Sequence, residues 1–325
     1  MAGNTSFEAA KANKNDEFYT KLDEIEKELK HYRDHFKDKH VFLNCDDPEY
    51  SNFWRFFYIN FDFLGLKHLT ATHYNDNEQT YRLDYYAEEN GQMTFLQTDL
   101  EQNGDFRSPE SLAILKECDI VVTNPPFSLF REYMEILMEY DKSFLIIGNQ
   151  NNVTYKEMIP LLQEDKIWLG VNSGTMEFQV PNTEEYHKKT SFRVDEKGHA
   201  WRKFGNICWY TNLDYPERHE DLILYKSYNP EEYPKYVNFD AIEVGTVKSI
   251  PFDYKGNMGV PITFLKDYNP DQFKIVGFSA NLAKSMKEIA NKGEYMQGGP
   301  RFYIKEQNGK YIYKRLYDRV VIKKI

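Results

Sequence analysis

The sequence has little cysteine and no long apolar run. Its three cysteines, Cys45, Cys118 and Cys208, are scattered through 325 residues without the spacing of a metal site. Each sits in an apolar or strand-like context, so we expect reduced, buried thiols and a cytoplasmic protein. No stretch suits a transmembrane helix, and the polar residues 1–15 lack a signal-peptide core, so we expect a mobile tail there and no membrane partner.

The chain also lacks net positive charge. Its formal charge of −10 argues mildly against a nucleic-acid partner. Basic residues nevertheless gather in two stretches, which supply the candidate DNA contacts Lys188, Lys189, Arg193, Arg202, Lys314, Arg315 and Arg319. A local basic face can bind DNA on an acidic protein, whereas a solvated surface is the alternative for each stretch. For the tail, an edge strand whose lysines discourage aggregation is a second alternative, because apolar residues alternate along it.

Strands and helices alternate in the first half of the chain. Apolar runs predict strands at 41–45, 66–72, 119–122 and 143–148, and helical periodicity predicts helices at 21–36, 108–116, 130–140 and 155–162. This alternation predicts an α/β fold with a mainly parallel central sheet. Residues 75–97 predict a hairpin insertion. From about residue 170, short strands with many Tyr, Pro and Gly residues predict a β-rich part.

The most informative motif follows the strand at 119–122. Asn124-Pro125-Pro126-Phe127 ends this strand, because two prolines fix φ and remove two backbone donors. The motif presents a side-chain amide at the carboxyl end of a strand, where open α/β sheets bind ligands. The Asn124 side-chain oxygen and the Pro125 carbonyl can each accept one N–H of a planar amine, while Phe127 stacks on its ring. This pattern is typical of an amino-methyltransferase acting on adenine, cytosine or a glutamine amide, although Pro-Pro after a strand is more often only a loop.

Other polar side chains lie at neighbouring turns. Asp46 and Asp47 follow the first strand, where a carboxylate can hold an amino or hydroxyl group of a nucleoside-bearing cofactor. For these strand-end residues a helix cap is the alternative. Asp105 can accept from an adenine amino group while Phe106 packs on the ring; for this pair a structural turn is the alternative. No Gly-x-Gly-x-x-Gly follows the first strand, so a dinucleotide lacks its phosphate cradle. S-adenosyl-L-methionine carries no phosphate and needs no such cradle.

A collinear series of motifs resembles the EcoRI-type family of adenine-specific DNA methyltransferases. The matching segments are NDEFYT at 15–20, NCDDP at 44–48, GDFRS at 104–108, TNPPFSLF at 123–130, FGNICWYTNL at 204–213, MGVPITFL at 258–265 and YNP at 268–270. The resemblance implies a Rossmann-like, S-adenosylmethionine-dependent methyltransferase fold. Its catalytic core would span 16–170, and residues 171–325 would hold the remaining core strands, a target-recognition region and the basic tail.

The same resemblance implies roles for individual residues. The implied cofactor contacts are Phe18, Tyr19, Thr20, Asn44, Asp46, Asp47, Asp105, Phe106 and Asn124, and the implied catalytic residues are Asn124, Pro125, Pro126 and Phe127, which would hold a flipped adenine. No metal is expected. The sequence Asp46-Asp47-Pro48 replaces the usual glycine-rich signature, and the acidic residue often found after the second strand is not evident among residues 71–75.

The implied partner is double-stranded DNA, with a short palindrome such as GAATTC as a candidate site. We expect a monomeric bacterial or phage-encoded enzyme that protects DNA against a cognate restriction endonuclease. Two alternatives stay open: an RNA or protein-glutamine methyltransferase with the same Asn-Pro-Pro-aromatic motif, and a non-catalytic DNA-binding module on the same fold. The β-rich second half and basic tail favour duplex DNA, and the intact motif at Asn124 argues against loss of catalysis.

Overall fold

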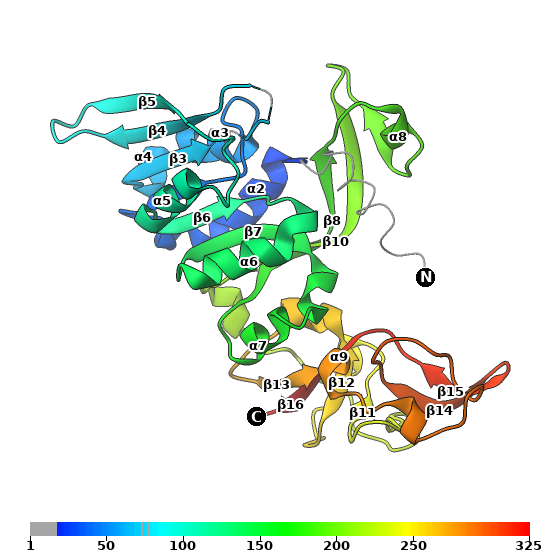
Figure 1. The fold of residues 1–325 in the computed structure, drawn as a ribbon. Helices are drawn as coiled ribbons and strands as arrows, with labels where there is room; N and C mark the ends of the chain where they lie inside the picture. Colours follow the sequence, from blue (N-terminus) through cyan, green and yellow to red (C-terminus); the bar gives the residue numbers. More distant parts are fainter. Residues whose placement is uncertain (1–17, 73, 77) are drawn as a thin grey trace. The chain divides into compact units, whose positions relative to one another are not determined.

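The computed structural model describes residues 18–325, except residues 73 and 77 (Figure 1). The predicted tail at 1–15, with Asp16 and Glu17, lies outside these described residues. The chain forms two compact units, one from residues up to 149 together with 169–215, the other from 150–168 together with 216–325. The division into two compact units therefore does not fall at residue 170, where we expected the catalytic core to end. As a division of function, that boundary stays a prediction.

The centre of the first unit is a parallel sheet. It consists of β2 (His40–Leu43), β3 (His68–Thr72), β6 (Ile120–Thr123) and β7 (Ser143–Asn149). The pairs β2–β3, β2–β6 and β6–β7 are parallel, as the alternation of strands and helices predicted. Nearly all residues of these strands are buried, which is the burial expected when helices cover both faces of a parallel sheet.

Antiparallel strands extend this sheet on both sides. The order is β1-β8-β10-β7-β6-β2-β3-β4-β5, and β9 pairs with β10. The added strands are β1 (Tyr19–Thr20), β4 (Tyr81–Ala87), β5 (Met93–Asp99), β8 (Trp168–Gln179), β9 (Phe192–Val194) and β10 (Ala200–Thr211). The predicted hairpin is β4–β5, which pairs onto β3 and forms the sheet edge. The sheet is therefore mixed, whereas the sequence predicted a mainly parallel one. The difference arises because β4 joins β3 and β10 joins β7 in antiparallel pairs.

The helices of the first unit agree with the periodicity of the sequence. They are α2 (Leu22–Leu29) continued by η1 (Lys30–His35), α3 (Asn52–Ile59), α4 (Phe61–Leu64), α5 (Pro109–Glu117), η2 (Phe127–Leu129), α6 (Phe130–Glu139) and α8 (Glu184–His187). Ser108 caps α5, because its hydroxyl accepts from the Ser111 N–H at 3.1 Å. Within the described part of the chain, no helix is long and apolar enough to cross a membrane.

A buried carboxylate joins α2 to β8. Glu28 is fully buried and accepts from the Tyr32 hydroxyl, from the backbone N–H groups of Val171 and Asn172, and from the Asn172 side chain, at 2.8–2.9 Å. Burial raises its pKa, against the effect of these hydrogen bonds. The carboxylate can approach β8 this closely because position 170 is glycine.

The second unit is built on a smaller sheet, with the order β11-β12-β16-β13, and a separate β14–β15 hairpin (Figure 1). Its elements are η3 (Gln150–Thr154), α7 (Met158–Gln163), η4 (Pro216–His219), β11 (Ile242–Glu243), η5 (Val247–Ser249), β12 (Met258–Pro261), η6 (Ile262–Asp267), β13 (Phe273–Phe278), α9 (Ser279–Leu282), η7 (Met286–Glu288), β14 (Tyr303–Asn308), β15 (Tyr311–Arg315) and β16 (Arg319–Lys324). β16 is a central strand, flanked by β12 and β13. The alternative of an edge strand is therefore wrong for residues 319–324.

Gly170→Ala should destabilise the protein. An added Cβ would lie 2.1 Å from the Glu28 Oε1 atom and 2.8 Å from the Trp209 Cβ atom, so a buried, hydrogen-bonded carboxylate would have to move. We expect a loss of roughly 1–3 kcal/mol in the free energy of unfolding, the usual cost of overpacking. The matched control is Gly205→Ala in β10, where an added Cβ meets nothing within 4 Å. Denaturant titrations that give equal midpoints for the two variants would contradict this role of Gly170.

Candidate functional site

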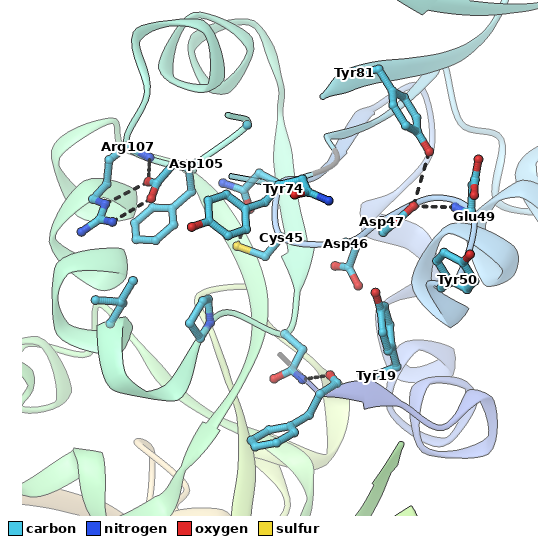
Figure 2. Close-up of a pocket in the computed structure, with 18 of the residues that line it drawn as sticks. Tyr19, Cys45, Asp46, Asp47, Glu49, Tyr50, Tyr74, Tyr81, Asp105 and Arg107 are labelled. Carbon is cyan, nitrogen blue, oxygen red and sulfur yellow. Dashed lines mark hydrogen bonds and ion pairs between the residues drawn. The ribbon is translucent and has the colours of Figure 1, made fainter. Parts of the chain in front are cut away.

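A cavity of about 640 Å³ lies in the first unit, beside the carboxyl ends of β2 and β6 (Figure 2). This volume is in the range of small-molecule sites. Its lining residues are Phe18, Tyr19, Asn44, Cys45, Asp46, Asp47, Glu49, Tyr50, Tyr74, Asn75, Glu78, Gln79, Tyr81, Gly104, Asp105, Phe106, Arg107, Asn124, Pro126, Ser128 and Leu129. The structure thus brings together, at the carboxyl ends of these central strands, the residues that follow β2 and β6 and the Asp105-Phe106 turn, all of which the sequence predicted for the site.

The Asn124 side chain is held in one orientation. Its Nδ2 group donates to the Phe18 carbonyl oxygen at 2.6 Å. Because a carbonyl only accepts hydrogen bonds, this contact fixes which end of the amide is nitrogen and which is oxygen. The Oδ1 atom then points away from Phe18, is buried, and receives no hydrogen bond from any described residue. A buried acceptor without a donor is uncommon in folded proteins and calls for a ligand that donates.

Asp46 ties the ends of the two strands together. Its carboxylate accepts from the Ser51 hydroxyl at 2.7 Å, from the Thr123 hydroxyl, and from the Asn124 backbone N–H. Burial raises the pKa of Asp46 to about 6, although these hydrogen bonds favour the charged form. Since its oxygens are occupied by the protein, Asp46 lines the cavity mainly as the group that positions Asn124.

The far side of the cavity is acidic and aromatic. Asp47 accepts from the Glu49 backbone N–H at 2.9 Å and from the Tyr81 hydroxyl at 3.4 Å (Figure 2). Burial raises the pKa of Tyr81, and the nearby carboxylates of Asp47 and Glu49 raise it further. A neutral phenol and carboxylates suit hydroxyl groups and positive charge in a ligand better than they suit phosphate.

The Asp105 carboxylate is paired within its own turn. Arg107 donates to it from Nη2 and Nε of the guanidinium at 2.7 and 2.9 Å, and from its backbone N–H at 2.8 Å. Burial pushes the pKa of Asp105 upward, but the hydrogen bonds from Arg107 outweigh it and hold the pKa below its usual range. Phe106 lines the cavity beside them, with its ring edge-on to Tyr133 at 4.9 Å.

Three of the expected site residues do not line the cavity. Phe127 packs edge-on against Phe18 and Phe178, with ring centroids 6.0 and 6.2 Å away. Pro125 is buried beneath the motif, and Thr20 is buried where β1 pairs with β8. Asn44 does line the cavity, but its Oδ1 atom accepts from the buried Tyr133 hydroxyl.

Several lining residues left no signal in the sequence. Tyr50, Tyr74, Glu78 and Tyr81 come from the start of α3, from the loop after β3 and from β4. The loop after β3 does carry an acidic lining residue, Glu78, but it lies beyond the window at 71–75. Tyr50 lies two residues after Pro48 of the Asp46-Asp47-Pro48 motif, so the turn after the first strand was the available signal for this residue.

The candidate DNA contacts divide between the two units. In the first unit, Lys188 is exposed and Lys189 half-buried near β9, Arg193 pairs with Glu177 at 2.8 Å, and Arg202 lies over the Phe204 ring at 4.5 Å. In the second unit, Lys314 of β15 pairs with Glu306 of β14 at 2.9 Å.

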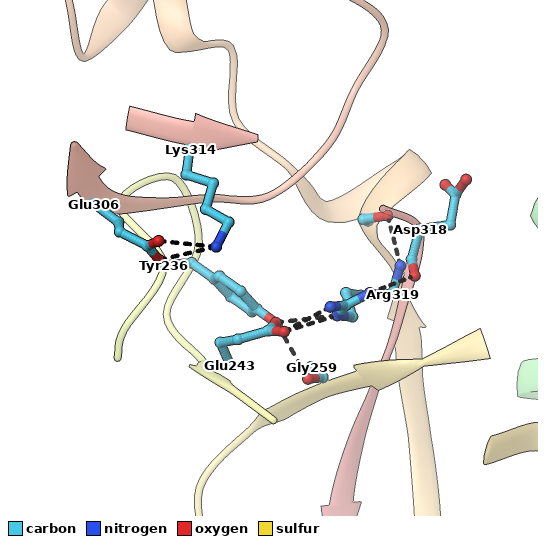
Figure 3. A network of polar contacts seen from close by, with 8 residues as sticks. Tyr236, Glu243, Gly259, Glu306, Lys314, Asp318 and Arg319 are labelled. Carbon is cyan, nitrogen blue, oxygen red and sulfur yellow. Dashed lines mark hydrogen bonds and ion pairs between the residues drawn. The ribbon is translucent and has the colours of Figure 1, made fainter. Parts of the chain in front are cut away.

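Arg319 is a correction to the set of DNA contacts. Its side chain is buried and donates to both Glu243 oxygens at 2.6–3.2 Å, while the Tyr236 hydroxyl donates to the same carboxylate (Figure 3). Gly259 leaves room for the Tyr236 ring. A buried guanidinium that is already paired with Glu243 offers no exposed charge to DNA phosphates, so Arg319 instead joins β16 to β11 inside the second unit.

The chain resembles known methyltransferases along nearly its whole length. A family model described as "Adenine-specific methyltransferase EcoRI" matches residues 6–325. Type II methyltransferase M.EcoRI of Escherichia coli is 46% identical over 91% of this chain and 96% of its own. M.MgeORF184P of Mycoplasma genitalium and M.MpnI of Mycoplasma pneumoniae are 39% and 38% identical, each over 98% of this chain and 98% and 97% of their own. No solved structure matches the chain.

The chain is an adenine-specific DNA methyltransferase of type II. This class is defined by the relatives just described, together with an α/β fold that carries an Asn-Pro-Pro motif at the carboxyl end of a central strand. The chain belongs to the EcoRI adenine-specific methyltransferase family. The activity and family predicted from the sequence are thus confirmed, and the RNA, protein-glutamine and non-catalytic alternatives are set aside. Among the described residues, no group of three or more His, Cys, Asp or Glu side chains is placed to hold a metal ion.

The β14–β15 hairpin leads to a testable prediction for DNA binding. Replacing Lys314 and Arg315 together by Ala should flatten the slope of log affinity against log salt by up to roughly 0.9 for each phosphate that is no longer neutralised. Preference for the recognition sequence should change little, because phosphate contacts position a protein and base contacts specify it. The matched control replaces two exposed lysines that face each other across β13 and β16, Lys274 and Lys323. Equal slopes for both double variants and the wild type, measured by fluorescence anisotropy, would leave the hairpin without a role in DNA binding.

Proposed function

We propose that this enzyme transfers a methyl group from S-adenosyl-L-methionine to the exocyclic amino nitrogen of an adenine flipped out of duplex DNA. The observation that carries the proposal is the buried, unpaired Oδ1 atom of Asn124, held in place by the Phe18 carbonyl. The target amine would supply the missing donor. The target atom cannot be reached inside a stacked duplex, so the base must leave the helix at a cost of a few kcal/mol.

Accepting hydrogen bonds is the chemistry that this amine needs. The adenine amino nitrogen is a poor nucleophile because its lone pair is delocalised into the ring. If Asn124 Oδ1 accepts one N–H and the Pro125 carbonyl accepts the other, the nitrogen becomes pyramidal and its lone pair is localised. The same two acceptors stabilise the positive charge that develops on nitrogen during transfer. No strong general base is needed, since the extra proton can leave afterwards.

The cavity fits the proposed cofactor. When bound, S-adenosyl-L-methionine would supply an electrophilic methyl group on a positively charged sulfur. Among the described lining residues, the carboxylates outnumber the single basic side chain, Arg107, which is paired with Asp105 and Glu132. This acidic lining suits a cationic ligand without phosphates. Asp105 and Phe106 would contact the adenine ring of the cofactor, and Asp47 its hydroxyl or amino groups. Phe18 and Tyr19 would line its other side.

The wider context follows from the family. We propose a Rossmann-like methyltransferase core, a monomeric enzyme, and a restriction endonuclease as its functional partner, with GAATTC as one candidate site. Phe127 would stack on the flipped base, at a gain of roughly 1–3 kcal/mol. Its ring is buried against Phe18 and Phe178, so this stacking would require the ring to become exposed when the base enters. Sequencing methyladenine in the DNA of an expressing host identifies the site directly.

Asn124→Ala should abolish most methyl transfer. It removes an acceptor that would stabilise charge in the transition state, so we expect the rate to fall on the order of 10²–10³-fold. Affinity for S-adenosyl-L-methionine should fall far less than the rate, because the lost oxygen is proposed to face the target amine and the other implied cofactor contacts remain. Transfer of labelled methyl groups to DNA measures the first quantity and calorimetry the second. Near-normal turnover of a folded Asn124→Ala variant would contradict the proposed role of Asn124 as the acceptor for the target amine.

Asp105→Ala should mainly weaken cofactor binding. The proposed contact is to the adenine ring of the cofactor, which does not change during transfer, so its loss removes uniform binding and leaves the rate at saturating cofactor nearly unchanged. Arg107→Ala is the matched comparison, because it removes the partner of Asp105 and keeps the carboxylate. If calorimetry shows wild-type cofactor affinity in Asp105→Ala, then Asp105 only stabilises the turn that it forms with Arg107 and does not bind the cofactor.

A further inference from the structure

Two residues at the start of α3 are linked by hydrogen bonds to the groups that hold Asn124. The hydroxyl of Ser51, the helix cap, donates to the Asp46 carboxylate, which also accepts from the Asn124 backbone N–H. The next residue, Asn52, holds β1: the Asn52 Nδ2 group donates to the Thr20 carbonyl oxygen at 2.8 Å.

The link through Asn52 ends on the Asn124 side chain. β1 is only two residues long, and its pairing with β8 joins Tyr19 to Gln179 and Thr20 to Phe178. Phe18, directly before it, supplies the carbonyl that holds the Asn124 amide at 2.6 Å. The buried Phe18 ring is anchored by packing against Phe127, Phe178, Tyr186 and Phe204. Ring packing does not fix the direction of a backbone carbonyl, so the bond from Asn52 to the neighbouring Thr20 carbonyl adds a directional constraint on this backbone.

We propose that Asn52 is a positioning residue for methyl transfer, acting through β1 and the Phe18 carbonyl to set the orientation of the Asn124 amide. The inference rests on the proposed role of Asn124 as acceptor. Asn52 itself does not line the cavity, whereas Phe18 and Asn124 do. Its side chain is half-buried, so its effect on the site must pass through the backbone of β1.

The geometry explains why a small shift matters. Methyl transfer needs the amine nitrogen held in line with the methyl group, and a misplacement of about 1 Å can cost on the order of 10²-fold in rate. If β1 loosens, Asn124 Nδ2 loses its partner and the amide can rotate. A rotated amide offers a donor where the amine needs an acceptor, and the two would repel.

The test uses Asn52→Asp and Asn52→Ala. Both remove the donor to Thr20, and the first is nearly isosteric. Asp at the first position of a helix also interacts favourably with the helix dipole, which offsets part of the cost of losing the bond to Thr20, so Asn52→Asp should remain folded. We expect single-turnover methyl transfer, with cofactor and DNA both saturating, to fall on the order of 10-fold or more in both variants. A variant that keeps its melting temperature but transfers methyl groups slowly would show that Asn52 positions the site and does not merely stabilise the fold.

Asn60→Asp is the matched control. Asn60 ends the same helix, and its Nδ2 group donates to a backbone carbonyl, that of Phe56, at 2.8 Å. The chemical change is the same, but it does not touch β1, so the single-turnover rate should stay at the wild-type value. Asn60 both ends α3 and caps α4, so the dipole effects on an Asp at these two helix ends oppose each other, and this control should stay folded.

Each result has a distinct meaning. Unchanged single-turnover rates in both Asn52 variants, alongside a strong loss in Asn124→Ala, would overturn the role of Asn52 and leave the proposed function standing. A rate that saturating cofactor restores would overturn it too, because it would show that β1 serves cofactor affinity alone. A loss confined to Asn52→Asp would point to its charge and contradict the proposal. Normal turnover of Asn124→Ala would overturn the proposed function itself.

Discussion

The hydrogen bond from Asn124 Nδ2 to the Phe18 carbonyl is the interaction on which the site depends. An amide side chain has two similar ends, and only one of them can accept a hydrogen from an amine. By occupying the nitrogen, Phe18 leaves the oxygen as the free end. The two prolines remove competing backbone donors directly beyond it. The orientation of the proposed catalytic amide is therefore selected by a main-chain contact from a segment more than a hundred residues away in the sequence.

The surrounding structure keeps this arrangement in place with two buried acids. Asp46 has a pKa raised to about 6, and it joins Ser51, Thr123 and the Asn124 backbone. Glu28 fixes β8, the strand with which β1 pairs. Burying a carboxylate is unfavourable unless hydrogen bonds compensate it, and both acids have such bonds. They hold strand ends whose relative position sets the geometry of the site.

Much of the fold and site could be predicted from the sequence, and the rest could not for physical reasons. Apolar runs located the parallel strands, because burial on both faces leaves a clear pattern. The Asn-Pro-Pro motif located the cavity, since two prolines end the strand and leave the Asn124 side chain at its carboxyl end. The β4–β5 hairpin was predicted as an insertion, but its pairing onto β3 was not, because β5 is largely exposed, and β1 is too short, at two residues, to leave a pattern. Arg319 was misjudged because its partner Glu243 is distant in sequence, and Glu78 was missed because the path of a loop is not evident from its residues.

The most direct test is a crystal structure of the enzyme with duplex DNA and a cofactor analogue that lacks the transferable methyl group. We predict that the amino nitrogen of a flipped adenine lies within about 3 Å of Asn124 Oδ1, while Nδ2 stays on the Phe18 carbonyl. A target amine held by other groups, or an Asn124 amide turned so that Nδ2 faces the base, would contradict the proposed role of Asn124.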